Sequence, residues 1–171
     1  MTARTLVLLR HAKADDPPGL ADVDRPLVMR GGLDAKAAGA WLASRKLVPD
    51  VVVCSPARRT RQTWHNVAVG LAEAGVEGGP AVSYERQLYG GDADDLLDLV
   101  RIIDEGAGTV LVIGHNPTVS DASIRLEPDG AAGAFTGLAT AGLAVHRCTG
   151  PWTTLGPATA ELVERHTARH S

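Results

Sequence analysis

The chain has 171 residues, of which 44% are hydrophobic, 22% are charged and 4% are aromatic. This length suits one domain over residues 1–171 that buries roughly 70% of its unfolded surface, which argues against a disordered chain or a disulfide-dependent scaffold. The 20 acidic and 17 basic residues give a formal net charge of −3. With so few aromatic rings, that charge argues against nucleic acid as a partner.

The cysteines and the N-terminal apolar run bear on where the protein works. Cys54 and Cys148 lie far apart and match no metal-ligand spacing, so we expect free thiols, no metal and a cytoplasmic location. The apolar run Leu6 to Leu9 is too short for a signal segment or a membrane span.

Short apolar runs alternate with amphipathic stretches, which is typical of strands connected by helices. Strands are predicted at Thr5–Leu9, Val51–Cys54, Val82–Tyr84 and Thr109–Ile113. Apolar residues at helical spacing predict helices between them, over Leu33 to Ser44, Thr60 to Leu71 and Leu96 to Ile103.

Capping residues predict where three helices begin. Ser55 and Asn116 each precede a proline, an arrangement that places a cap before the first helical residue. Asp92, with two further acidic residues close behind it, predicts a third helix start.

The C-terminal third of the sequence predicts an antiparallel edge of the sheet. Leu138 to His146 and Trp152 to Leu155 are expected to be strands, and Ala158 to Arg169 a polar helix. The loops Asp15 to Asp24 and Pro128 to Gly137 either border a site or are solvated connections. The expected fold class is α/β, a three-layer α/β/α sandwich with a mostly parallel sheet.

Cationic and imidazole side chains follow three of the predicted strands. Arg10 and His11 follow the first strand, and His115 follows the fourth. Arg59 lies four residues after Ser55, one turn into the helix after the second strand. Because the carboxyl ends of parallel strands share one edge, these side chains should converge. Guanidinium groups and helix N-termini together predict a phosphoryl pocket that needs no metal.

The motifs themselves resemble a known family. Arg10-His11, "SPARRTRQT" from Ser55 to Thr63 and "GHNP" from Gly114 to Pro117 resemble the histidine phosphatase superfamily, which has the phosphoglycerate-mutase-like fold. Further strings resemble the short bacterial phosphohistidine phosphatases of the SixA type; these are "DRPLVMRG" from Asp24 to Gly31, Leu88-Tyr89, and "TAGLAV" followed by Trp152.

The resemblance implies a role for each candidate site residue. His11 would be the nucleophile, Arg10 and Arg59 would clamp the phosphoryl oxygens, and His115 would complete the cluster. Asn116 is a further candidate for phosphate contact. The family works without a cofactor, so none is expected.

One family feature is missing. Phosphatases and mutases of the superfamily usually carry a general-acid Glu after the third strand, where this chain reads Leu88 to Gly90. Glu85, Asp92 or a carboxylate of the Asp15 to Asp24 loop could donate the proton instead. Alternatively the leaving group needs little help, since phosphohistidine departs as imidazole, whose conjugate acid has a pKa of ~6.5.

These features predict a cytoplasmic, bacterial, metal-independent phosphatase, monomeric or weakly associated, acting on phosphohistidine in proteins or on a small phosphorylated metabolite. A phosphomutase of the same fold is the first alternative, but the chain is short for a lid that retains the phosphoryl group. A non-catalytic phosphate-binding regulatory module is the second, although the set of arginines and histidines is complete. A zinc hydrolase is disfavoured because the two arginines would repel a dication.

Overall fold

The computed structural model describes residues 3–128 and 137–171, and within them six strands form one sheet in the order β3-β2-β4-β1-β5-β6. The strands are β1 (Arg4–Arg10), β2 (Val51–Cys54), β3 (Ala81–Tyr84), β4 (Thr109–Gly114), β5 (Gly142–Cys148) and β6 (Ala160–Thr167). The first four are parallel to one another, β5 is antiparallel to β1, and β6 is antiparallel to β5.

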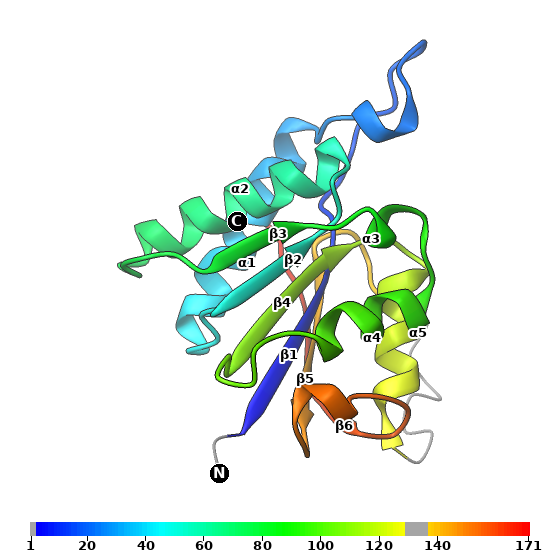
Figure 1. Cartoon of the computed structure of the whole chain (residues 1–171). Coiled ribbons are helices and arrows are strands. Elements are labelled where there is room, and N and C mark those ends of the chain that lie inside the picture. The colour runs from blue at the N-terminus through cyan, green and yellow to red at the C-terminus, as the bar shows by residue number, and fades with distance from the viewer. Residues whose placement is uncertain (1–2, 129–136) are drawn as a thin grey trace.

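Helices cover both faces of this sheet (Figure 1). The helices α1 (Met29–Ser44) and α2 (Arg58–Glu73) lie on one face, and α4 (Ala93–Arg101) and α5 (Thr118–Leu126) lie on the other. The short elements are η1 (Asp22–Asp24), α3 (Gln87–Gly90) and η3 (Trp152–Thr154). The predicted α/β/α sandwich with an antiparallel edge is therefore confirmed. None of the helices in the described ranges is long and apolar enough to cross a membrane.

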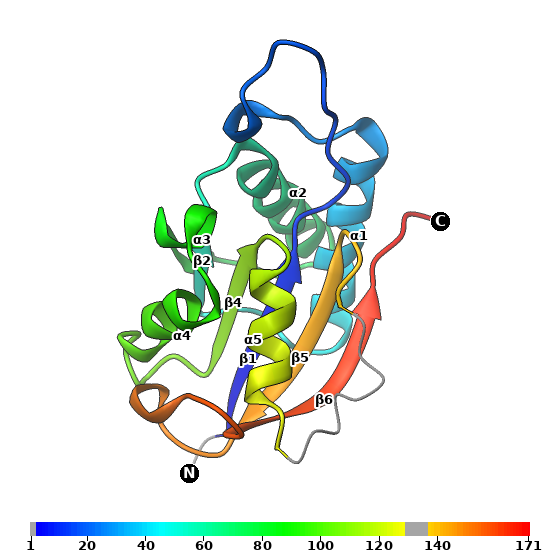
Figure 2. The same ribbon diagram turned by 90° about the vertical axis from the view of Figure 1, so that its right-hand side faces the viewer.

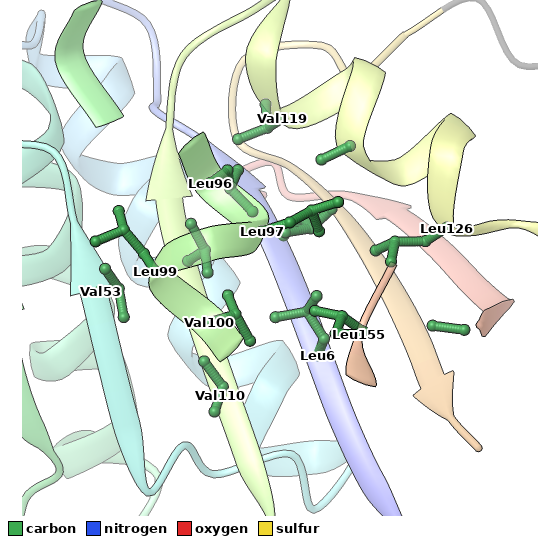
Figure 3. Close-up of a cluster of buried hydrophobic side chains, with 14 of the residues drawn as sticks. Leu6, Val53, Leu96, Leu97, Leu99, Val100, Val110, Val119, Leu126 and Leu155 are labelled. Carbon is green, nitrogen blue, oxygen red and sulfur yellow. The ribbon is translucent and has the colours of Figure 1, made fainter. Parts of the chain in front are cut away.

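The central strand β1 contributes to two hydrophobic cores. Leu6 and Leu8 belong to the cluster between the sheet and α4 and α5, part of which Figure 3 shows. Val7 and Leu9 belong to the cluster on the α1 and α2 side. Because both faces of β1 are buried, its sequence is a continuous apolar run rather than an alternating one.

The helices α1 and α2 pack with their backbones in direct contact. A Cβ atom on Gly39 would lie 2.1 Å from the carbonyl oxygen of Val67, and one on Gly70 would lie 2.1 Å from that of Lys36. Neither position therefore has room for a side chain. This contact fixes α2, whose first turn carries Arg59.

One predicted helix start is confirmed and two are wrong. Asp92 and Asp95 form a capping box at the start of α4, as its acidic sequence predicts. In contrast, α2 starts three residues after Ser55 and α5 starts two residues after Asn116, and neither side chain caps its helix. Both side chains instead bond to residues near the carboxyl edge of the sheet.

The C-terminal predictions need three corrections. Residues Ala160–Thr167 form the edge strand β6, not a helix, because alternate residues face inward and pair with β5. Trp152–Thr154 is a 3-10 helix, in which the buried Trp152 donates its Nε1–H to the carbonyl oxygen of Ala107 at 2.9 Å. The strand predicted from Leu138 begins at Gly142. Most of the predicted Pro128 to Gly137 loop, residues 129–136, lies outside the described residues.

The two cysteines are free and buried, which confirms the expectation of unpaired thiols. Burial raises the pKa of Cys54 to about 12 and that of Cys148 to about 11. Both thiols therefore stay protonated near neutral pH and are poor nucleophiles.

Candidate active site

The carboxyl edge of the parallel strands brings three loop starts together. Beyond the last pair of the β1–β4 ladder, the N–H of His11 donates to the carbonyl oxygen of Gly114 at 3.0 Å. On the other side of β4, the N–H of Ser55 donates to the carbonyl oxygen of Ile113 at 3.0 Å. These bonds continue the sheet by one residue on each side of β4, so the residues that follow β1, β2 and β4 are neighbours.

His11 and His115 lie side by side at this edge. Their ring centroids are 5.4 Å apart, with the ring planes inclined by 57°. The ring of Tyr89, from α3, meets the His115 ring edge-on at 5.7 Å. The residues that follow β1 and β4 thus share one small site with a residue of α3, as the convergence argument predicts for the two histidines.

The proton on His11 can be placed from one contact. Its Nδ1 atom lies 2.7 Å from the carbonyl oxygen of Ala12, which can only accept, so Nδ1 carries the proton and Nε2 keeps a lone pair. Burial, together with the charges of Arg59 and Arg10, lowers the pKa of His11 to about 4 against the opposing hydrogen bond to Ala12. His11 is therefore a neutral imidazole near pH 7.

His115 is held by a buried hydroxyl group. Its Nε2 atom lies 2.7 Å from Oγ of Ser55, and its Nδ1 atom is buried without a hydrogen-bond partner among the described residues. Burial lowers the pKa of His115 to about 3, with further contributions from the charge of Arg59 and from His11. The ring is neutral, and Nδ1 is its one uncommitted nitrogen.

Arg59 is almost fully buried, with 7% of its surface exposed. Its Nη1 atom donates to the backbone oxygen of Asp22 at 2.7 Å, and its Nη2 atom donates to Oδ2 of the same residue at 3.1 Å. The Nε atom of Arg59 is buried without a partner among the described residues. The guanidinium group is thus fixed from one side by a residue of η1.

Asp22 gathers three donors. Its Oδ2 atom also accepts from the hydroxyl of Tyr89 at 2.7 Å, and its Oδ1 atom accepts from Arg25 at 3.2 Å. The hydrogen bond from Tyr89, followed by those from Arg25 and Arg59, lowers the pKa of Asp22 to about 2. The carboxylate is therefore ionised at any physiological pH.

Arg10 and Asn116 meet at a shared acceptor. Nη1 of Arg10 and Nδ2 of Asn116 both donate to the carbonyl oxygen of Leu138, at 3.1 and 2.8 Å. Oδ1 of Asn116 accepts from Ser120 at 2.5 Å, and the hydroxyl oxygen of Ser120 in turn accepts the N–H of Leu138. Asn116 thus links α5 to the chain before β5, close to Arg10, instead of capping its helix.

The two proton-donor candidates differ in their setting. Asp92 is exposed, and its carboxylate accepts the N–H of Asp95 as a helix cap. Hydrogen bonds from Asp95 lower the pKa of Asp92, so this carboxylate is ionised near neutral pH, which argues against a proton-donor role. Glu85 is half-buried directly after β3, and its N–H donates to the carbonyl oxygen of Cys54 at 2.9 Å. Glu85 and Ser55 therefore follow two adjacent strands, β3 and β2.

Three residues of the site were not singled out from the sequence. Ser55 is conspicuous in the sequence because it precedes Pro56, but a helix cap explains that position without any role in the site. Asp22 and Tyr89 lie within segments that drew attention, yet nothing in their local sequence predicts a bond between them. Within residues 3–128 and 137–171, no three His, Cys, Asp or Glu side chains are grouped so as to hold a metal ion.

Comparisons with known proteins show the family and the fold. A model of the histidine phosphatase superfamily (branch 1) matches residues 6–77. An uncharacterized protein of Mycobacterium tuberculosis is 36% identical over 167 residues, which are 94% of this chain and 100% of that protein. A solved structure from Nakamurella multipartitia, assigned as a phosphohistidine phosphatase SixA, is 37% identical with a TM-score of 0.86 over 98% of each chain. The protein histidine phosphatase SixA complexed with tungstate shares the fold at 21% identity, with a TM-score of 0.77 over 95% of this chain and 96% of that chain.

Proposed function

The chain belongs to the histidine phosphatase superfamily and is a phosphatase, and from this premise we propose that it forms a phosphohistidine intermediate on His11 without a metal ion. Its proposed substrates are phosphohistidine in proteins or a small phosphorylated metabolite. The name of the similar SixA structure supports the first of these two classes.

The observation that carries the proposal is the fixed tautomer of His11. With its proton held on Nδ1 by Ala12, the ring offers an Nε2 lone pair next to His115. Burial and, to a smaller extent, the nearby cations disfavour protonation of this imidazole, so the nucleophile stays in its reactive form at neutral pH.

The chemistry takes two steps. In the first, a bond forms between phosphorus and Nε2 of His11 while the bond from phosphorus to the leaving group breaks. Arg10 and Arg59 offset the negative charge of the transferring group, and in this proposal the unpartnered Nδ1 of His115 contacts one of its oxygens. In the second, water attacks phosphorus, and His11 is released as inorganic phosphate forms.

The ionisation of the nearby carboxylates favours a leaving group that departs without a strong acid. Asp22 and Asp92 both have lowered pKa values, so neither carboxyl group holds a proton that it could donate near pH 7. An alkoxide needs a proton as it leaves, whereas a phosphorylated imidazole that already carries a proton on its other ring nitrogen leaves as a stable neutral ring. The arrangement therefore supports phosphohistidine or another phosphoramidate over a simple phosphomonoester.

The test is direct detection of the intermediate. The protein is mixed with a phosphohistidine-bearing protein, quenched without acid and analysed by intact mass. We expect a species heavier by one phosphoryl group, which is absent in His11→Ala and present in the control His65→Ala, whose histidine is exposed on α2. Normal turnover by His11→Ala would contradict the nucleophile assignment. Phosphate binding without turnover by the wild-type protein would favour a regulatory module instead.

A further inference from the structure

The segment that joins β1 to α1 carries a negative charge into the phosphoryl site. This segment, residues 15–28 and here called the flap, rises above the carboxyl edge of the sheet (Figure 2). It contains η1, whose Asp22 binds Arg59 through both a backbone oxygen and a carboxylate oxygen. An ionised carboxylate therefore lies in contact with an arginine that the proposed mechanism uses to bind phosphoryl oxygens.

The carboxylate does not depend on Arg59 to stay in place. The hydroxyl of Tyr89 donates to it at 2.7 Å, the shortest of its bonds, and Arg25 donates to its other oxygen. Arg25 is itself fixed, since its Nε atom donates to the backbone oxygen of Asp15 at 2.9 Å. If a phosphoryl group draws the Nη2 donor of Arg59 toward itself, Asp22 keeps two partners and remains beside the site.

The base of the flap is also held. The N–H of Val28 donates to the carbonyl oxygen of Lys13 at 3.0 Å, and the N–H of Leu27 donates to the side-chain oxygen of Gln62, on α2, at 2.7 Å. A Cβ atom on Gly31 would lie 2.2 Å from the Lys13 oxygen, so α1 starts in direct contact with the chain that leaves β1. The C-terminal end of the flap is thus tied to the chain that follows His11 and to α2, which carries Arg59.

We propose that Asp22 determines substrate specificity, by repelling substrates that carry a second negative charge close to the phosphoryl group and admitting those whose neighbouring groups are neutral or cationic. This inference rests on the proposed function of the same site. Like charges that share a partly desolvated site repel, whereas a cation near Asp22 gains an attractive partner. The substrate class it indicates is a phosphorylated imidazole or amine, or a phosphoryl group beside basic residues, rather than a carboxylated phosphoester.

The size of the effect follows from exposure. The Asp22 side chain is 54% exposed, so solvent screens its field, and its influence should be moderate and sensitive to salt. We expect a change in relative affinity of about threefold to tenfold when its charge is removed.

Equilibrium binding tests the proposal independently of turnover. Calorimetry would give the dissociation constants of phosphoethanolamine and phosphoglycolate, two-carbon phosphoesters that differ in an ammonium against a carboxylate group. We expect Asp22→Asn to shift the affinity ratio toward phosphoglycolate by about threefold to tenfold, with a smaller shift at high ionic strength. Asp16→Asn removes the same charge from the same flap, but Asp16 faces Arg25 at 3.5 Å and is largely exposed, so the ratio should stay at the wild-type value.

Each other outcome overturns the proposal. An unchanged ratio in Asp22→Asn would show that the carboxylate does not sense the substrate, and an equal shift in Asp16→Asn would reduce the effect to overall charge. Weaker binding of both probes by Asp22→Asn, with the ratio unchanged and the fold intact by circular dichroism, would show that Asp22 only positions Arg59. The proposed function fails separately, if the wild-type protein yields no phosphorylated species on His11.

Discussion

Ser55 and His115, which follow the adjacent parallel strands β2 and β4, form a buried hydroxyl–imidazole pair, with Oγ 2.7 Å from Nε2. Oγ of Ser55 also accepts the N–H of Ala57 at 3.4 Å, and Nε2 of His115 is the one acceptor in range of its hydroxyl proton among the described residues, so we assign that proton to the bond with Nε2. The neutral ring then carries its own proton on Nδ1, the nitrogen without a partner among the described residues. Ser55 therefore fixes His115 as a hydrogen-bond donor through Nδ1, as the proposed contact with a phosphoryl oxygen requires.

Replacing Ser55 by alanine should remove the hydrogen bond that holds the proton of His115 on Nδ1. We expect Ser55→Ala to lower kcat/KM by about 10-fold to 100-fold, somewhat less than the loss of a whole oxyanion donor. Ser123→Ala is the matched control, because Ser123 is a buried serine whose Oγ lies 2.7 Å from Nε2 of His146. Both variants should lose about 1–3 kcal/mol of unfolding free energy, but only Ser55→Ala should lose activity. Equal activities would contradict the role of Ser55.

The two site histidines should make stability depend on pH. Their folded pKa values, about 4 for His11 and about 3 for His115, lie below the ordinary value of 6.5. The unfolded chain therefore binds more protons below pH 6.5, and the stabilisation that is complete above that pH declines as the pH falls toward 4. The slope is at most about 1.4 kcal/mol per pH unit for each histidine.

Urea unfolding at pH 7, 6 and 5 would measure this slope. In His115→Asn one contribution is absent, so the slope should fall, but by less than half, because burial also lowers the pKa of His146. Asp22, whose folded pKa is about 2, affects stability only below pH 4 and leaves this window undisturbed. A wild-type stability that stays constant from pH 7 to pH 5 would contradict the prediction.

The contact between α1 and α2 predicts opposite effects for two glycines of one helix. Gly39→Ala would place a methyl group 2.1 Å from the Val67 oxygen, so the helices must separate, at a cost of about 1–3 kcal/mol. At Gly32 the nearest atoms, from Asn66, are 3.6 Å away, and alanine should stabilise the helix by about 0.5–1 kcal/mol. Chemical denaturation of both variants measures the two changes in the free energy of unfolding, which should have opposite signs.

Two substitutions decide the proton-donor question. Asp92→Asn removes an acid but keeps a good helix cap, so we expect unchanged turnover and melting temperature, whereas Asp92→Ala should lower the melting temperature by removing the cap of α4. Glu85→Gln should leave turnover of a phosphohistidine substrate unchanged, because imidazole leaves without a strong acid. A loss of about 100-fold or more in Glu85→Gln would instead identify Glu85 as the general acid.

Sequence reasoning predicts best where the local pattern and the tertiary environment agree. The run from Leu6 to Leu9 reads as a buried strand because both of its faces are covered. The sequence of Ala160–Thr167 predicts a helix because this edge strand carries many polar residues, which obscure the weak alternation of inward-facing and exposed positions. Its pairing with β5, rather than its own propensity, makes it a strand.

The candidate site divides in the same way. The convergence of His11 and His115 follows from the rule that parallel strands end at one edge. The bonds of Asp22 do not follow from any rule of this kind, since its partners Arg59 and Tyr89 lie 37 and 67 residues further along the chain. Only the path of the flap brings these three residues together.

The place of β1 in the sheet also constrains how the protein is made. β1 is synthesised before β4 and β5, yet it lies between them, where Leu6 pairs with Val110 on one side and with His146 on the other. Such non-local pairing slows folding, because loop closure must precede the contacts that compensate for it. A nascent chain that lacks β5 cannot complete the sheet around His11, so catalytic competence should arise late in translation, when nearly the whole domain is available.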